Sequence, residues 1–98
     1  MRLEWSAFAI EDRDAIFDYI EEDSPRAAVV VDDRIRVQVR QLLQYPETGR
    51  PGRVDGTREL VIRRTPYIAA YRVSGDVVRI LRVLHGAQQW PDEILDYQ

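Results

Sequence analysis

Four residues in the second half of the chain are of types that could move a proton or stabilise phosphate charge. His85 is the only histidine, and its side chain has an ordinary pKa near neutrality, so it is the natural candidate for a general acid or base. Glu59 or Tyr71 could assist it, and Arg79 could stabilise negative charge on a substrate. The structural alternative is that a histidine at the end of a strand caps a carbonyl or packs under the next turn. Both interpretations of His85 stay open.

The composition excludes several other kinds of chemistry. The 98 residues include no cysteine and one histidine, which excludes a disulfide framework, a thiolate nucleophile and an ordinary zinc site. We therefore expect no metal and no cofactor. No apolar run approaches the roughly 20 residues of a membrane span, and residues 1–5 lack the apolar core of a signal peptide. These features predict a cytoplasmic protein without a membrane partner.

Positive charge is concentrated in one part of the chain. Residues 1–49 hold six arginines against eleven acidic residues, whereas residues 50–89 hold eight arginines against three acidic residues. Every cation is arginine, so no lysine is present to transfer a proton. The second stretch could face an anionic partner although the net charge is −3. The alternative is that these arginines lie on ordinary solvated strand faces.

Two helices are predicted to follow a short first strand. Ser6 can cap a helix that ends near Asp23, and acidic residues in its early turns suit the helix dipole. Ser24 followed by Pro25 predicts that a second helix begins at once, because proline is tolerated in the first helical position. Two helices with so short a link form an antiparallel hairpin.

Residues 25–45 carry two competing patterns. Residues 35–40 alternate with a period of two and are rich in β-branched side chains, which is typical of a strand. An apolar stripe with helical spacing consists of Ala28, Val31, Ile35, Val39 and Leu42. Because this stripe is unbroken and the segment is too long for a typical strand, we predict a helix.

Three strand-like runs follow a loop at 47–56 that is rich in glycine and proline. They cover residues 58–64, 67–73 and 77–85, and the short turns between them predict an antiparallel meander. The third run is apolar at both alternating positions, so we expect a central strand covered on both faces. The hairpin can supply one cover, which leaves the other face as an open apolar surface for a partner. We therefore predict one α+β domain over residues 1–98, with an N-terminal strand and a helical hairpin packed on an antiparallel sheet.

Strand alternation separates three of the candidate binding residues. A regular strand places Arg79 and His85 on one face and Arg82 on the other, so the three cannot meet one substrate. We expect Arg82 to pair with an acidic residue of the hairpin, whereas Arg79 could bind a partner or an internal acid.

Three further residues are candidates for partner binding. Arg63 and Arg64 point to opposite faces of a strand, so at most one lies on the open side, where it could anchor acidic residues of a partner. Trp90 could fold back over a sheet edge or the hairpin, or it could anchor a target, since tryptophan is frequent among interface anchors.

The order of elements and four spaced motifs resemble the RelE/ParE toxin superfamily. The motifs are Tyr45-Pro46-x-x-Gly49-Arg50, Arg58-Glu59-Leu60, Tyr67-x-x-x-Tyr71-Arg72-Val73 and Val83-Leu84-His85-Gly86-Ala87-Gln88. The resemblance implies a toxin of a type II toxin–antitoxin system, with a role in plasmid stabilisation. It also implies a cognate antitoxin, encoded beside the toxin, whose disordered tail wraps it in a heterotetramer or larger complex. Operator DNA would be contacted only through that antitoxin.

The superfamily contains two activities of different class. RelE-like members are ribosome-dependent mRNA endoribonucleases that use lysines and arginines of the sheet, and those positions fall at Glu59, Val61 and Ile68 here. ParE-like members inhibit DNA gyrase without being enzymes. The missing cations and the acidic net charge favour the ParE-like branch, as do the two long helices. A ribonuclease would use His85, Tyr71, Arg79 and Glu59. A silenced relative that binds only its antitoxin is a third interpretation.

Overall fold

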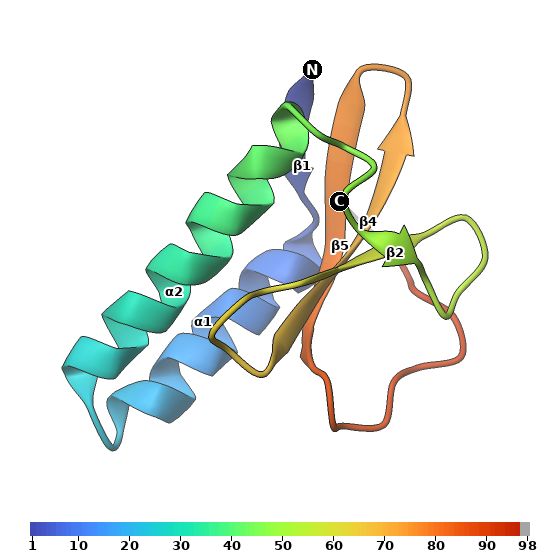
Figure 1. Cartoon of the computed structure of the whole chain (residues 1–98). Helices are drawn as coiled ribbons and strands as arrows, with labels where there is room; N and C mark the ends of the chain where they lie inside the picture. The colour runs from blue at the N-terminus through green and yellow to red at the C-terminus, as the bar shows by residue number, and fades with distance from the viewer. Residues whose placement is uncertain (97–98) are drawn as a thin grey trace.

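The computed structural model describes residues 1–96 and shows two helices packed on a five-stranded mixed sheet (Figure 1). The elements in chain order are β1 (Arg2–Trp5), α1 (Ala7–Glu21), α2 (Pro25–Arg40), a 3-10 turn (Gln41–Leu43), β2 (Arg50–Pro51), β3 (Arg58–Val61), β4 (Tyr67–Ser74) and β5 (Val77–His85). The order across the sheet is β1-β5-β4-β3-β2, with β1 parallel to β5 and the other neighbours antiparallel. The predicted α+β class is confirmed, but the sheet is mixed because the first strand pairs in parallel with the last.

Both helices begin at the predicted caps. The Ser6 hydroxyl accepts a hydrogen bond from the Ala9 amide at 3.0 Å, and the Ser24 hydroxyl accepts one from the Ala27 amide at 3.1 Å. Pro25 occupies the first position of α2, as its missing N–H allows. The chain between the helices is short, and α1 and α2 lie side by side against one face of the sheet (Figure 1).

The helical pattern of α2 prevails over the alternating one. Ala28, Ile35 and Val39 are at most 1% exposed, and Ile35 and Val39 belong to the hydrophobic core, as the predicted stripe requires. Val37, which belongs only to the alternating pattern, is 46% exposed. The period-two pattern therefore has no structural counterpart, because burying the stripe with helical spacing removes more apolar surface from water.

The three predicted strand runs are present, but the first is shorter than predicted. β3 ends at Val61, and the next residues form the turn to β4, where Arg64 has a positive φ of 66°. Arg63 and Arg64 therefore lie in a turn and not on opposite faces of a strand, which corrects that prediction. The predicted loop at 47–56 also contains the two-residue strand β2.

A β-bulge in β5 changes the faces on which its charged residues lie. Ala70 pairs with Arg82 and Tyr71 pairs with Ile80, so Leu81 is the extra residue. Arg79, which pairs with Arg72, therefore shares a face with Arg82, whereas His85 pairs with Tyr67 on the helix-covered face. The prediction that Arg79 and His85 share a face was wrong, because it assumed a regular strand.

The sheet face away from the helices is not open, contrary to the prediction. Ile68 is 6% exposed, Ala70 is 0% exposed and Leu84 is 4% exposed on that side. The segment after β5 turns back along this face, and the loop after β2 lies on the same side (Figure 1). Asp96 holds the returning segment through two hydrogen bonds from Arg79 at 2.8 and 2.9 Å. The chain therefore buries the centre of this face with its own residues.

The junction of β1 and α1 is fixed to the bulge of β5. The Ser6 amide donates to the Ile80 carbonyl at 2.9 Å, and the Ser6 hydroxyl donates to the Leu81 carbonyl at 2.8 Å. Ser6 is fully buried, so its hydroxyl satisfies two backbone groups that have no access to water. One side chain thus caps α1 and positions it beside β5.

We predict that Ser6→Ala lowers the free energy of unfolding by about 2 kcal/mol, because a helix cap is lost and a buried carbonyl loses its donor. The matched control is Ser24→Ala, which removes the cap of α2 at a partly exposed site and should cost about 1 kcal/mol. Urea denaturation of both variants measures the difference. Equal losses would show that the bond to Leu81 contributes nothing.

Candidate functional site

Tyr71, one of the candidate ribonuclease residues, is engaged in holding a loop. Its ring is fully buried, and its hydroxyl donates to the Pro46 carbonyl at 2.7 Å and accepts from the Gly49 amide at 2.9 Å. Burial raises the pKa of the Tyr71 phenol above its ordinary value, although the bond from Gly49 and the charge of Arg58 oppose this. A methyl group at Gly49 would lie 2.6 Å from the same hydroxyl, so glycine is required there. The motif that joins Tyr45-Pro46 to Gly49 therefore has a packing explanation.

Glu59 is buried in an ion-paired cluster on the opposite face of the sheet. The side chain is 2% exposed, and its carboxylate accepts from the Arg50 guanidinium at 3.1 Å and from the Arg53 amide at 2.8 Å. The Arg53 guanidinium also approaches it at 3.4 Å and stacks over the Trp90 ring at 3.9 Å. A buried carboxylate needs such partners, so Glu59 joins the loop after β2 to the sheet.

Arg79 and Arg82 are both held by carboxylates. Arg79 binds Asp96 and also approaches Glu4 at 3.3 Å, and its hydrogen bonds to Asp96 raise the pKa of its guanidinium. Arg82 forms a two-pronged pair with Asp12 of α1 at 2.8 and 3.0 Å, as predicted for an acid of the hairpin. The bonds to Asp12 likewise raise the pKa of Arg82.

His85 lies at the end of β5 on the helix-covered face. Its Nδ1 accepts a hydrogen bond from the Ala87 amide at 3.0 Å, and its ring meets Tyr67 edge to face at 5.6 Å between centroids. A shallow hollow beside it is lined by α1, Tyr67 and Gln88. These contacts are those of a histidine that stabilises the turn after a strand.

Trp90 caps the free edge of β5 just beyond that turn. Its indole N–H donates to the His85 carbonyl at 3.2 Å, while the Gln88 side chain accepts from the His85 amide at 2.9 Å. The tryptophan therefore covers a sheet edge, which is one of the two placements that the sequence left open.

The four candidate catalytic residues do not converge. Tyr71 and His85 lie on the helix-covered face, whereas Glu59 and Arg79 lie on the other face. His85 and Arg79 are six residues apart along β5, or roughly 20 Å for an extended strand. A general acid and a charge-stabilising group must both lie within about 3 Å of the reacting atoms. Among residues 1–96, these four groups form no shared site.

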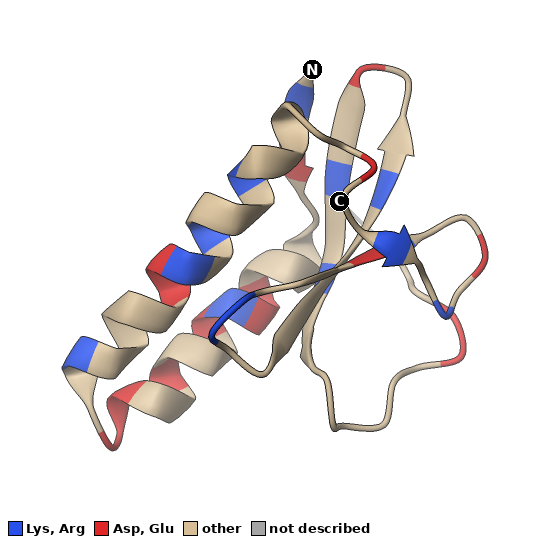
Figure 2. Ribbon diagram, viewed as in Figure 1, with Lys and Arg blue, Asp and Glu red and all other residues tan. Residues whose placement is uncertain are grey.

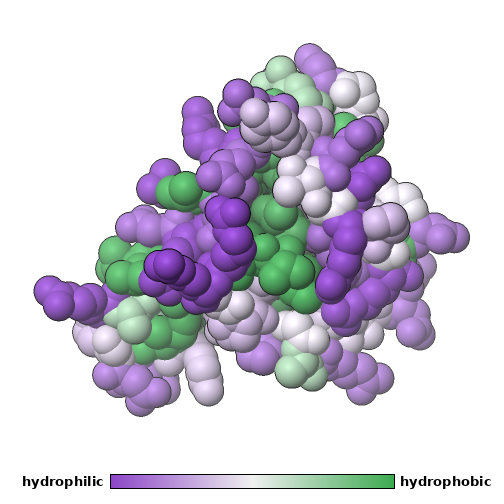
Figure 3. All heavy atoms as spheres, viewed as in Figure 1, coloured by the Kyte–Doolittle hydropathy of each residue, from purple (hydrophilic) through white to green (hydrophobic). Residues whose placement is uncertain are grey.

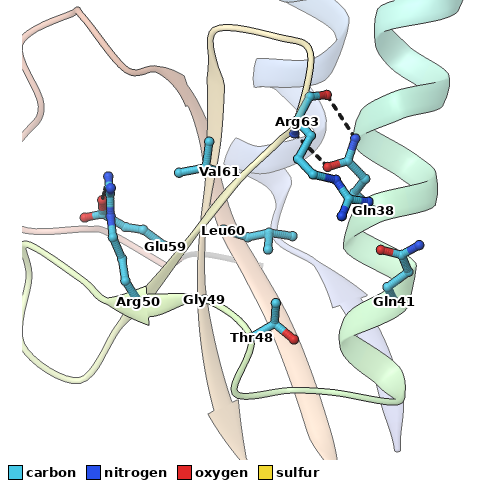
Figure 4. Close-up of a pocket in the computed structure, with 9 residues that line it drawn as sticks. All are labelled: Gln38, Gln41, Thr48, Gly49, Arg50, Glu59, Leu60, Val61 and Arg63. Atoms are coloured by element: carbon cyan, nitrogen blue, oxygen red, sulfur yellow. Dashed lines mark hydrogen bonds and ion pairs between the residues drawn. The ribbon is translucent and has the colours of Figure 1, made fainter.

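A groove lies beside α2 and the edge of β3. It encloses about 280 Å³ and is lined by Gln38, Gln41, Thr48, Gly49, Arg50, Glu59, Leu60, Val61 and Arg63 (Figure 4). Gln38 bridges the groove, since it donates to the Arg63 carbonyl at 3.1 Å and accepts from the Arg63 amide at 2.7 Å. Figure 2 shows basic positions at β2 and at the turn between β3 and β4. Arg50 and Arg63, which lie in these two segments, both line the groove.

The described residues offer no metal site and no membrane span. Over residues 1–96, no three histidine or acidic side chains are grouped so that they could hold a metal ion. Within the same residues, neither helix is long and apolar enough to cross a bilayer.

The fold is that of the RelE/ParE toxin superfamily, in agreement with the motifs. The family model of the ParE toxin of type II toxin–antitoxin systems, parDE, matches residues 3–90. A chain of the chromosomal ParDE TA system from P. aeruginosa superposes with a TM-score of 0.78 and 36% identity, covering 87% of this chain and 95% of that one.

Two relatives from bacteria are similar over most of their length. The protein named "Putative toxin Y4kP" of Sinorhizobium fredii is 50% identical over 90 residues, which cover 92% of this chain and 93% of that protein. Toxin RelE2 of Caulobacter vibrioides is 38% identical over 84 residues, which cover 86% of this chain and 93% of that protein. The chain belongs to the ParE toxin family of type II toxin–antitoxin systems.

We predict that Tyr71→Phe lowers the free energy of unfolding by about 1–2 kcal/mol, because the Gly49 amide and the Pro46 carbonyl lose their common partner. Tyr19→Phe is the control, since Tyr19 is 73% exposed and its change should cost less than about 0.5 kcal/mol. Urea denaturation at neutral pH measures both.

The raised pKa of Tyr71 adds a pH dependence. The unfolded chain loses this proton near pH 10 while the folded chain keeps it, so stability falls as the pH rises above about 10. Tyr71→Phe should show a smaller fall over that range than the wild type. An equal fall would mean that Tyr71 ionises as readily in the folded state as in the unfolded state.

Proposed function

We propose that the chain is a ParE-like toxin that inhibits DNA gyrase by protein–protein contact and is not itself an enzyme. The observation that carries the proposal is the separation of the candidate catalytic groups on the two faces of the sheet. Hydrogen bonds or ion pairs within the chain already occupy the side chains of Tyr71, Glu59 and Arg79. A toxin whose candidate catalytic groups lie on separate faces of the sheet acts most simply by binding its target.

The partner that neutralises the toxin is a cognate antitoxin. The structural neighbour from P. aeruginosa is part of a ParDE system, which supports a heteromeric complex, a heterotetramer or larger, for this chain as well. Arg63 and Arg64 suit such a partner, because both are exposed and neither has an ion-pair partner in the described part of the chain. Operator DNA would be reached through the antitoxin, and plasmid stabilisation is a role that fits the pair.

The second candidate function is a ribosome-dependent mRNA endoribonuclease. The name of the Caulobacter relative, RelE2, favours it. It would require His85 to serve as a general acid or base together with groups that reach the same phosphate from other elements.

We expect purified toxin to inhibit the supercoiling of relaxed plasmid by gyrase, and we expect its expression without antitoxin to induce DNA damage signalling. His85→Ala should change the inhibition by less than about threefold, because the turn that this histidine stabilises is small. In a ribonuclease the same change should lower the rate of mRNA cleavage by roughly 100-fold or more.

Two outcomes of these assays would contradict gyrase inhibition. Cleavage of ribosome-bound message with supercoiling untouched would replace the gyrase proposal by the ribonuclease one. Inhibition of neither process, in a chain that still binds its antitoxin, would leave the binding-only interpretation.

A further inference from the structure

Positive charge without a carboxylate partner is concentrated in one part of the molecule. In residues 1–96, eight of the fourteen arginines form an ion pair with a carboxylate. The other six are Arg26, Arg34, Arg40, Arg58, Arg63 and Arg64. Arg58 donates to the backbone carbonyls of Glu47 and Gly49. The remaining five all lie on α2 or in the turn between β3 and β4.

Hydrogen bonds join α2 and this turn into one surface. The Arg34 guanidinium donates to the Arg64 carbonyl at 3.1 Å. Gln38 donates to the Arg63 carbonyl at 3.1 Å and accepts from the Arg63 amide at 2.7 Å. These contacts hold the turn against the middle of α2, so the arginines of the two segments lie beside one another.

Arg26 and Arg40 extend the surface toward the two ends of α2. Both are exposed, and positions 26, 30, 33, 37 and 40 follow one stripe of the helix. The two arginines are roughly 21 Å apart along the helix axis, at about 1.5 Å per residue. Asp33 is the acidic residue of this stripe, and it already pairs with Arg36 at 3.6 Å. The stripe therefore carries a row of positive charge.

The acidic helix α1 lies on the opposite side of α2 from this turn. Asp32 of α2 pairs with Arg13 of α1 at 2.8 Å, whereas Arg34, two residues further on, reaches the turn. Five acidic residues and one arginine occur in α1, but four arginines and two aspartates occur in α2 (Figure 2). In the space-filling view, hydrophilic atoms border an apolar strip between α2 and β2 (Figure 3). A large anion can thus approach the arginines with the acids of α1 turned away.

We propose that this basic face, formed by α2 and the β3–β4 turn, binds the phosphate backbone of double-stranded DNA without regard to base sequence. A guanidinium group offers a phosphate two parallel N–H donors. Because five of these arginines have no carboxylate partner, a phosphate displaces only water from them. The inference goes beyond gyrase inhibition and does not depend on it. Arg63 and Arg64 also suit the antitoxin, so the contact with DNA belongs to the toxin on its own.

The side chains of the basic face favour a duplex over other anionic partners. Single-stranded nucleic acids are bound largely by stacking their bases on aromatic rings, and protein interfaces are commonly anchored by aromatic residues. Neither α2 nor residues 62–66 contain an aromatic side chain. Each strand of B-DNA presents one phosphate per 3.4 Å of its axis, so a row of roughly 21 Å spans about six base pairs. Phosphate contacts carry no sequence information, which distinguishes this binding from operator recognition.

The test measures binding of the full-length toxin to a fluorescent duplex of about 20 base pairs by anisotropy, from about 50 to 200 mM NaCl. We expect a Kd of about 100 µM or tighter at the lowest salt. The slope of log affinity against log salt should be about −3 to −4.5, because three to five phosphates are neutralised. A duplex of unrelated sequence should bind equally within about twofold.

Single substitutions locate the contact. Arg26→Gln, Arg40→Gln and Arg64→Gln should each weaken binding about threefold or more and make the salt slope shallower by about one. Arg72→Gln is the matched control, because it removes the same charge from β4, where the side chain is 42% exposed and lies 3.9 Å from Asp96. This control should change the affinity less than about twofold. All four variants should keep the wild-type urea midpoint, which separates a lost contact from a lost fold.

Four outcomes would overturn the proposal, and none of them bears on the gyrase assay. The first is absence of binding at about 50 mM NaCl, and the second is an equal loss in Arg40→Gln and Arg72→Gln. The third is a single-stranded RNA of the same length that binds about tenfold more tightly than the duplex, which would identify RNA as the ligand. The fourth is displacement of the duplex by polyglutamate at equal charge concentration, which would identify an acidic polypeptide.

Discussion

Pairing the backbone groups at the two edges of a small sheet is the constraint on which most of this structure depends. A sheet edge exposes unpaired N–H and C=O groups that invite another strand, and small proteins must cover them. The free edge of β5 beyond β1 is covered by side chains: Asp12 accepts from the Val83 amide at 2.9 Å, and Gln88 and Trp90 take the two groups of His85. On the other edge, Gln38 covers Arg63. Each helix thus contributes one polar side chain to an edge of the sheet.

The β-bulge at Leu81 is what lets α1 serve one of these edges. It adds a residue where β1 ends and α1 begins, so the Leu81 carbonyl turns to the Ser6 hydroxyl. Arg82, which follows the extra residue, reaches Asp12 of α1. Asp12 then accepts from both the Arg82 guanidinium and the Val83 amide. The charge of Arg82 thereby helps to place α1, as expected for an arginine that pairs with the hairpin.

The helices, the meander and the family followed from the sequence because hydrophobic periodicity, capping residues and turn residues are local signals. Ser6, Ser24 and Pro25 mark helix starts without reference to the rest of the chain. The bulge at Leu81 has no local signal of this kind, because every residue around it is apolar or arginine and suits a regular strand equally well.

The cover of the far sheet face could not be predicted for a related reason. It depends on Asp96 returning to Arg79, a contact across 17 residues of chain that contain no periodic pattern. The types of the candidate site residues could be noted from the sequence, but the faces of Arg79 and His85 relative to each other depend on the bulge. Gln38 bonds the backbone of Arg63 just beyond the end of β3. Nothing in the sequence distinguishes it from any other exposed polar residue of a helix.

The internal pairs also bear on the choice between the two target classes. An arginine that serves phosphate chemistry must offer its N–H groups to the substrate, but Arg79 and Arg82 offer theirs to Asp96 and Asp12 in partly buried pairs. Separating such a pair without replacing its charge costs several kcal/mol, and each 1.36 kcal/mol added to a barrier slows a reaction by about tenfold. A catalytic role for either arginine would thus begin with a penalty of about 100-fold. Arg63, which lines the groove beside α2, has no carboxylate partner within residues 1–96 and carries no such penalty.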